Sequence, residues 1–153
     1  MANTFSQIYI HIVFAVKGRS NLISSNWEDR LYQYITTIVH NKGQKMMAIN
    51  GMPDHIHIFI GMKPECSISD LVREIKKSSN QFIKVNKLTN YKFEWQAGFG
   101  AFSYNKSQVH NVVNYVLNQK QHHQKKSFQK EYLEILDKFE IKYDEKYLFE
   151  WYD

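Results

Sequence analysis

The chain has 153 residues, of which 43% are hydrophobic, so its composition fits a single folded domain over residues 1–153 and excludes a disordered chain. No stretch is long and apolar enough to span a membrane, the start carries no secretory signal pattern, and the single cysteine, Cys66, excludes an intrachain disulfide, so we expect a cytoplasmic protein without membrane contact. The formal net charge of +5, from 20 Lys and Arg against 15 Asp and Glu, favours a polyanionic partner such as nucleic acid.

The first predicted elements are a strand and a helix. Residues 7–16 alternate in polarity and place Ile10 and Phe14 on one face, which predicts a strand. Residues 27–41 carry Leu31 and Ile35 at helical spacing, which predicts a helix.

A hairpin and a second helix follow. Residues 45–50 read as a strand, residues 51–54 as a tight turn, and residues 55–61 as the partner strand. Ser67 is placed to open a helix that carries Ile68, Leu71 and Ile75.

The C-terminal part combines one more strand region with two helices. Residues 93–103 predict a strand or a strand pair broken by glycines, residues 108–121 a helix with a valine stripe, and residues 128–139 a further amphipathic helix. The order β-α-β-β-α-β-α-α predicts an α+β, ferredoxin-like βαββαβ core with an antiparallel sheet and helices on one face. We place this core at about residues 5–104 and a C-terminal helical extension at about residues 107–153.

Two histidines in the hairpin are the first candidate site. His55 and His57 are two apart on a strand, so both point to one face while Ile56 and Ile58 point to the other. Two neighbouring imidazoles can bind one divalent metal. The alternative is a polar strand edge that faces solvent, and the pair alone does not decide between the two.

A tyrosine and a glutamine on the helix of residues 108–121 are the second candidate. Tyr115 and Gln119 are four apart and therefore share a helical face, which we expect to be partly exposed where the helix meets the sheet. They could equally be ordinary boundary residues. His122 and His123 extend this face, and we expect a solvated helix end there rather than phosphate binding.

Together these segments resemble the single-tyrosine HUH transposases of the smallest bacterial insertion sequences, where HUH means His, a bulky hydrophobe and His. His55-Ile56-His57 satisfies that motif, and Tyr115 and Gln119 follow as Tyr-x-x-x-Gln. The opening strand, the turn of residues 51–54 and the run from Trp95 to Ser103 also look like the family, in family order.

The resemblance implies specific roles. The metal ligands fall on His55, His57 and Gln119, and the nucleophile falls on Tyr115. A divalent metal, Mg²⁺ or Mn²⁺, suits these neutral ligands, and the imidazole pair favours Mn²⁺. The family also works as a dimer, so a homodimer with the tyrosine helix exchanged between subunits is expected.

The implied substrate is single-stranded DNA with a hairpin near each transposon end, cleaved and rejoined through a 5'-phosphotyrosine. Basic residues near the first strand and on the second helix are available to its backbone; they are Lys17, Arg19, Arg73, Lys76 and Lys77. A solvated charged surface would explain each of them equally well.

Three other functions compete with this interpretation. A non-catalytic nucleic-acid-binding module would use the sheet, the aromatic residues and the positive charge. A metal-dependent hydrolase would use water as its nucleophile, but the only carboxylate beside the histidines in sequence is Asp54, which the turn explains. A domesticated relative could cleave repeated palindromes without moving its own gene.

Overall fold

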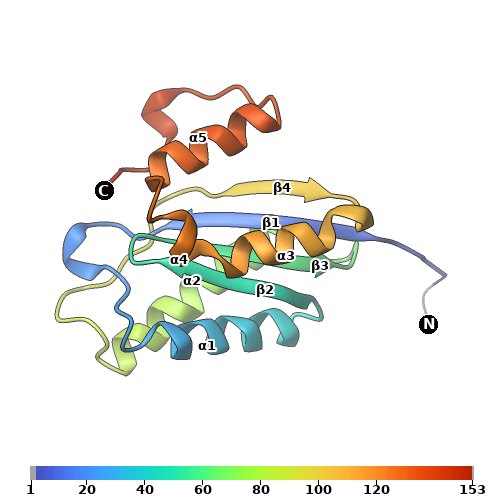
Figure 1. Cartoon of the computed structure of the whole chain (residues 1–153). Helices are drawn as coiled ribbons and strands as arrows, with labels where there is room; N and C mark the ends of the chain where they lie inside the picture. Colours follow the sequence, from blue (N-terminus) through green and yellow to red (C-terminus); the bar gives the residue numbers. More distant parts are fainter. Residues whose placement is uncertain (1–2, 153) are drawn as a thin grey trace.

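The computed structural model describes residues 3–152 and forms a four-stranded antiparallel sheet with helices on both sides (Figure 1). The strands are β1 (Ile8–Ala15), β2 (Lys45–Met52), β3 (His55–Met62) and β4 (Gly100–Tyr104), and their order in the sheet is β2-β3-β1-β4. The helices are α1 (Glu28–Asn41), α2 (Ile68–Val85), α3 (Val109–Leu117), α4 (Gln119–His122) and α5 (Phe128–Lys138). The predicted fold class is therefore confirmed.

One face of the sheet is apolar and packs against α1 and α2 (Figure 1). Alternation along β1 and β3 sends Ile12, Phe14, Ile56 and Ile58 into this layer, and none of the four is exposed to solvent. Ser67 caps α2 as predicted, since its Oγ accepts a hydrogen bond from the Asp70 backbone N–H. This layer is the main hydrophobic core.

The opposite face of the sheet lies under α3, α4 and α5 (Figure 1). Phe59 and Ala48 project from it and pack against Val112 and Val116 of α3. Lys120 of α4 donates a hydrogen bond of 2.6 Å to the carbonyl of Gly51 in β2, which fixes α4 next to that strand. The odd-numbered residues of β3 therefore face the C-terminal helices.

Two predicted elements differ from the structure. The strand expected over residues 93–103 is limited to β4, with an isolated bridge between Val16 and Trp95 before it. The helix expected over residues 108–121 is broken at Asn118. This residue has a φ of −98° and a ψ of 22°, which are not helical, and it separates α3 from α4. Within residues 3–152, no helix has the length and apolar content that a membrane span requires.

Candidate active site

The paired histidines lie on an interior strand and are fully buried. The exposed fraction is 0% for both His55 and His57. Strand β3 is flanked by β1 and β2, and the helices α3 to α5 cover this face. The solvent-facing strand edge considered from the sequence is therefore wrong, while the prediction that both imidazoles share one face is confirmed.

Each imidazole is held at Nδ1 by a neighbouring side chain. His55 Nδ1 lies 2.7 Å from Asp54 Oδ1, and His57 Nδ1 lies 2.7 Å from His11 Nε2. A carboxylate only accepts hydrogen bonds, so Nδ1 of His55 carries the proton and Nε2 is the ligating atom of the neutral ring. Both Nε2 atoms point toward the C-terminal helices, at the carboxylate of Glu131.

Glu131 on α5 brings a carboxylate into the centre of the site. Its exposed fraction is 3%, and its Oε1 lies 3.1 Å from His57 Nε2, 3.0 Å from His123 Nε2 and 3.4 Å from His55 Nε2. Burial alone raises the pKa of Glu131, but the charge of His57, the hydrogen bonds from His123 and His57, and the nearby His55 imidazole outweigh it and hold the pKa below the usual range. The group is therefore a buried anion.

This environment shifts the pKa values of the histidines in different directions. Burial lowers the pKa of His57, and Glu131 offsets this only in part. Burial also lowers the pKa of His11, and the neighbouring His57 lowers it further. Burial acts the same way on His55, but its hydrogen bond to Asp54 and the nearby carboxylate of Glu131 raise its pKa overall.

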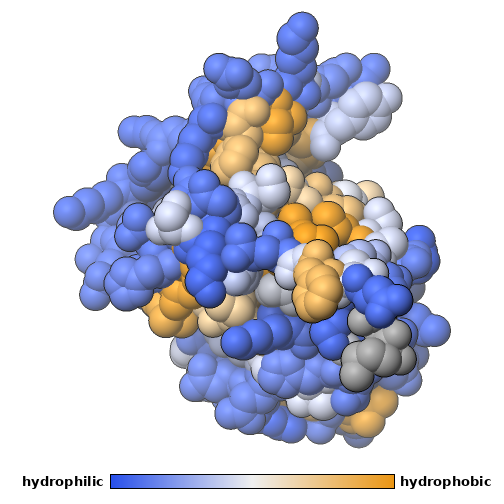
Figure 2. All heavy atoms as spheres, turned by 90° about the vertical axis from the view of Figure 1, so that its right-hand side faces the viewer, coloured by the Kyte–Doolittle hydropathy of each residue, from blue (hydrophilic) through white to orange (hydrophobic). Residues whose placement is uncertain are grey.

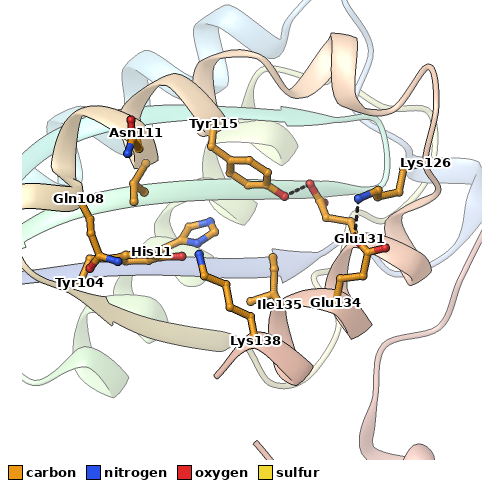
Figure 3. A pocket seen from close by; sticks show the side chains of 11 residues that line it. His11, Tyr104, Gln108, Asn111, Tyr115, Lys126, Glu131, Glu134, Ile135 and Lys138 are labelled. Carbon is orange, nitrogen blue, oxygen red and sulfur yellow. Dashed lines mark hydrogen bonds and ion pairs between the residues drawn. The ribbon is translucent and has the colours of Figure 1, made fainter. Parts of the chain in front are cut away.

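Tyr115 reaches this cluster from α3. Its hydroxyl donates a hydrogen bond to Oε2 of Glu131 (Figure 3). Its ring centroid lies 5.8 Å from that of His57. Burial raises the pKa of Tyr115, and the charge of Glu131 and this hydrogen bond raise it further. The structure thus places the predicted nucleophile beside the predicted metal pair within one chain.

Gln119 lies deeper than the sequence predicted. Its exposed fraction is 0%, so the expectation of partial exposure is wrong for this residue, although Tyr115 is half-buried as expected. Gln119 Nε2 donates a hydrogen bond of 3.1 Å to Glu131 Oε2, whereas its Oε1 has no hydrogen-bond partner. The break at Asn118 turns the Gln119 side chain inward at the start of α4.

The four predicted residues lie together with Glu131, and this cluster could hold a metal. Ligand atoms of His55, His57 and Glu131 all lie within 4.8 Å of one another. Two buried atoms beside them, His55 Nε2 and Gln119 Oε1, have no hydrogen-bond partner. Both have the lone pairs that a divalent cation needs, so the donor set fits a metal ion.

A cavity of about 390 Å³ opens beside the tyrosine, between α3 and α5 (Figure 3). Tyr115, Glu131 and His11 form its inner end, while Tyr104 and Lys138 stand at its walls. In the side view of Figure 2, most of the surface is hydrophilic, and apolar atoms gather in a few small areas, including one near the C-terminal elements at the top. The cavity combines aromatic walls with cations, which suits a nucleotide.

The predicted DNA-binding residues lie elsewhere, in two groups. Lys17 and Arg19 follow β1, where Lys17 pairs with Glu94 and Arg19 lies over the ring of Tyr152. Arg73, Lys76 and Lys77 belong to α2, on the opposite side of the sheet from Tyr115 (Figure 1). None of the five lines the cavity beside the tyrosine.

Lys76 is bound within the fold. Its Nζ donates hydrogen bonds of 2.9 Å to the Gln96 carbonyl and 2.7 Å to the Gly98 carbonyl. Burial lowers the pKa of Lys76 to about 8. Arg73, by contrast, is 72% exposed in its side chain and pairs only with Asp70 on its own helix.

Sequence reasoning missed three residues of the site. Glu131 was assigned to an ordinary amphipathic helix, and His123 was expected at a solvated helix end, which is wrong because only 4% of its side chain is exposed. His11 received no prediction beyond its place in the first strand. The available signal was a carboxylate at position 131, on the apolar stripe of its helix between Phe128 and Ile135.

Comparison with known proteins agrees with this site. A family model described as "Transposase IS200 like" matches residues 4–119. The ISDra2 transposase TnpA of Deinococcus radiodurans is 27% identical over 73 residues, which are 48% of this chain and 52% of that protein. The alignment thus spans about half the length of that curated relative.

Two solved structures share the fold. A Deinococcus radiodurans R1 protein, described as a candidate transposase, superposes with a TM-score of 0.61 at 19% identity, covering 78% of this chain and 95% of the other. A REP-associated tyrosine transposase bound to a REP hairpin gives a TM-score of 0.59 at 18% identity, covering 80% of this chain and 73% of the other. Because the family model covers most of the chain, including the histidine pair and Tyr115, this protein belongs to the IS200-like transposase family.

Proposed function

We propose that this protein cleaves and rejoins single-stranded DNA, with Tyr115 as the nucleophile and a divalent metal held by His55, His57 and Gln119. One observation carries the proposal: the Tyr115 hydroxyl contacts a buried cluster of histidines and one carboxylate, in a chain of the IS200-like family. A binding module without chemistry has no need to bury such a cluster, because burying polar and charged groups costs free energy.

The residues present fit a metal. The atoms His55 Nε2 and Gln119 Oε1 are buried without partners, and Asp54 fixes the tautomer of His55 that leaves Nε2 free to bind. A bound Mg²⁺ or Mn²⁺ would polarise the scissile phosphate and offset the charge that develops on it. Neutral imidazole and amide ligands would leave most of its charge for the DNA.

The chemistry of Tyr115 follows from its surroundings. Its oxygen attacks phosphorus and forms the Tyr–O–P bond, the bond from phosphorus to the 3'-oxygen breaks, and the 3'-oxygen leaves as a hydroxyl after taking a proton. The product is a 5'-phosphotyrosine, and the reverse attack by a 3'-hydroxyl rejoins a strand without ATP. The raised pKa of Tyr115 keeps its proton on the hydroxyl in the resting site, which protects the nucleophile until a phosphate arrives.

The proposed substrate is single-stranded DNA marked by a hairpin. The cavity beside Tyr115 offers Tyr104 for stacking with a base and Lys138 for a phosphate. Arg73 and Lys77 belong to α2, on the other side of the sheet from Tyr115 (Figure 1), where a hairpin stem could bind along the helix, and Lys17 and Arg19 follow β1. A solved structural neighbour is described as bound to a REP hairpin, which supports this substrate class.

A cleavage assay tests the proposal. Labelled single-stranded oligonucleotides with the palindromes that flank the gene are incubated with Mn²⁺ or Mg²⁺ and run on a denaturing gel. We expect a covalent protein–DNA adduct from the native protein and none from Tyr115→Phe, which removes one hydroxyl and keeps the ring. An adduct of normal yield from Tyr115→Phe would refute Tyr115 as the nucleophile.

The proposal extends to a homodimer that exchanges the tyrosine helix. In the described chain Tyr115 lies beside its own histidines, so exchange requires α3 to leave this position and enter the partner's site. A mixture of His57→Ala and Tyr115→Phe contains one complete site per mixed dimer only if the helix is exchanged. Cleavage by the mixture, with no cleavage by either variant by itself, supports exchange of the helix. No cleavage, with mixed dimers seen by native mass spectrometry, supports sites within one chain.

A further inference from the structure

Glu131 lies outside the part of the chain that the family model matches, yet it lies against the histidine pair, Gln119 and Tyr115. The matched residues end at 119, whereas Glu131 belongs to α5. Its two oxygens face different partners: Oε1 faces the Nε2 atoms of His55, His57 and His123, and Oε2 faces the Tyr115 hydroxyl and the Gln119 amide. This carboxylate therefore joins the metal pair to the nucleophile.

We propose that Glu131 is a ligand of the metal ion, binding it through Oε1 while Oε2 retains the Tyr115 hydroxyl. The inference rests on the proposed metal-dependent function and adds an anionic ligand to its neutral set. It also makes α5, which follows the tyrosine helices in sequence, a part of the metal site.

The spacing of the atoms supports this role. Glu131 Oε1 lies 3.1 Å from His57 Nε2 and 3.4 Å from His55 Nε2. In an octahedral shell with metal–ligand distances of about 2.1 Å, adjacent ligand atoms lie about 3 Å apart. Both distances from Glu131 Oε1 to the histidine nitrogens thus match the spacing of neighbouring ligands on a single ion.

The hydrogen-bonding roles of His55 also support a metal ion beside Glu131. Because Asp54 accepts the proton of Nδ1, the lone pair of the neutral ring at Nε2 faces Oε1 of Glu131, and the two are not hydrogen-bonded. Two lone pairs at this distance repel each other unless a proton or a metal cation lies between them. A divalent cation would satisfy both, and carboxylate oxygens are the ligands that Mg²⁺ and Mn²⁺ favour.

Neighbouring residues hold Glu131 in place for this task. His123 Nε2 lies 3.0 Å from Oε1, and the Gln119 amide donates to Oε2, which directs the unpartnered Gln119 Oε1 into the site. The Phe128 ring, on the same helix, stacks on the His55 ring with centroids 3.7 Å apart. Removing the carboxylate would therefore weaken metal binding both directly and through Gln119.

The test measures binding of Mn²⁺ alone, by the loss of the free-ion electron paramagnetic resonance signal and by calorimetry, without DNA. The set comprises the native protein, Glu131→Gln, His57→Ala and the control Glu134→Gln. Glu134 lies on the same helix and lines the same cavity, but it is about half exposed and pairs with Lys126. We expect Glu131→Gln to weaken Mn²⁺ binding at least about tenfold and Glu134→Gln to leave it within about twofold.

The outcomes separate this inference from the function that underlies it. Native-like or tighter Mn²⁺ binding by Glu131→Gln, with binding lost in His57→Ala, would overturn Glu131 as a ligand and leave the histidine site standing. Native-like binding by His57→Ala would overturn the metal site itself. Thermal unfolding identifies any variant that fails to fold. If Glu131→Gln does so, Glu131→Asp, which keeps the charge on a shorter side chain, takes its place and must also bind Mn²⁺ more weakly for the inference to stand.

Discussion

The two faces of the same sheet are buried for different purposes. On one face, isoleucines of β3 and β1 pack against α1 and α2 and stabilise the fold by removing apolar surface from water. On the other, β1 and β3 bury His11, His55 and His57 against a glutamate and a glutamine. Burying those polar groups costs free energy that hydrogen bonds only partly return. The comparison supports our proposal that the second face carries out chemistry, and adjacent residues of β3 allow a direct test of that difference.

The largest expected effect is the loss of cleavage in His57→Ala. The substitution removes one Nε2 ligand from the site and the partner of His11. Transition-state stabilisation by a metal is worth several kcal/mol, so the cleavage rate should fall about a hundredfold or more. Single-turnover cleavage of a hairpin oligonucleotide in Mn²⁺ gives the measurement. A native rate would show that the polar face has no catalytic role.

The neighbouring substitution Ile58→Ala should affect stability instead. Ile58 is fully buried in the apolar layer, so its truncation should lower the free energy of unfolding by about 2–5 kcal/mol. We expect only about 1 kcal/mol for His57→Ala, because the loss of packing is offset by removing a buried polar group. Urea unfolding of both variants measures the difference. An equal or larger loss for His57→Ala would show that the polar face is a stabilising core.

The polar face should also make stability depend on pH. The pKa values of His57 and His11 are lowered by folding, so each contributes stability above the unfolded pKa near 6.5 and loses it as pH falls toward the folded value. The lowered pKa of Glu131 also makes the fold less stable as pH falls, but at lower pH. The raised pKa of His55 has the opposite effect, because the stability that His55 contributes is full below pH 6.5 and is lost as pH rises.

We therefore expect the free energy of unfolding, measured in a metal chelator, to fall as the buffer is changed from pH 7 to pH 5. Each proton taken up only on unfolding contributes about 1.4 kcal/mol per pH unit. In His11→Gln the slope should be smaller, because one of these groups no longer titrates. Stability that rises over this range would contradict the assignment of directions.

The smallest effect is expected on the apolar side, at the outer surface of α2. The double variant Arg73→Gln with Lys77→Gln should weaken hairpin binding and reduce the slope of log affinity against log salt by about 2, one for each lost phosphate contact. Lys76→Gln should instead lower stability, because the Lys76 ammonium is bound to two backbone carbonyls. Fluorescence anisotropy at several salt concentrations checks both. An unchanged slope in the double variant would remove α2 from the DNA interface.

The sequence predicted those parts of the site that follow from local periodicity. Alternation along residues 55–61 correctly placed the two histidines on one face, and spacing on the helix correctly brought Tyr115 near Gln119. Burial depends on which segment covers that face, and periodicity carries no such information. Glu131 lies 74 residues from His57, so only the tertiary packing of α5 reveals their contact. The break at Asn118 could not be predicted either, because no proline or glycine lies near it in the sequence.

The most direct test of the central claim is to locate the DNA on the protein. The native protein is allowed to react with a hairpin oligonucleotide in Mn²⁺, the covalent adduct is trimmed by a nuclease, and the peptides are sequenced by tandem mass spectrometry. Our account predicts a nucleotide linked through phosphate to Tyr115, the tyrosine whose hydroxyl contacts Glu131. A nucleotide on another residue, such as Tyr104 at the cavity wall, or cleavage without any adduct, would contradict it.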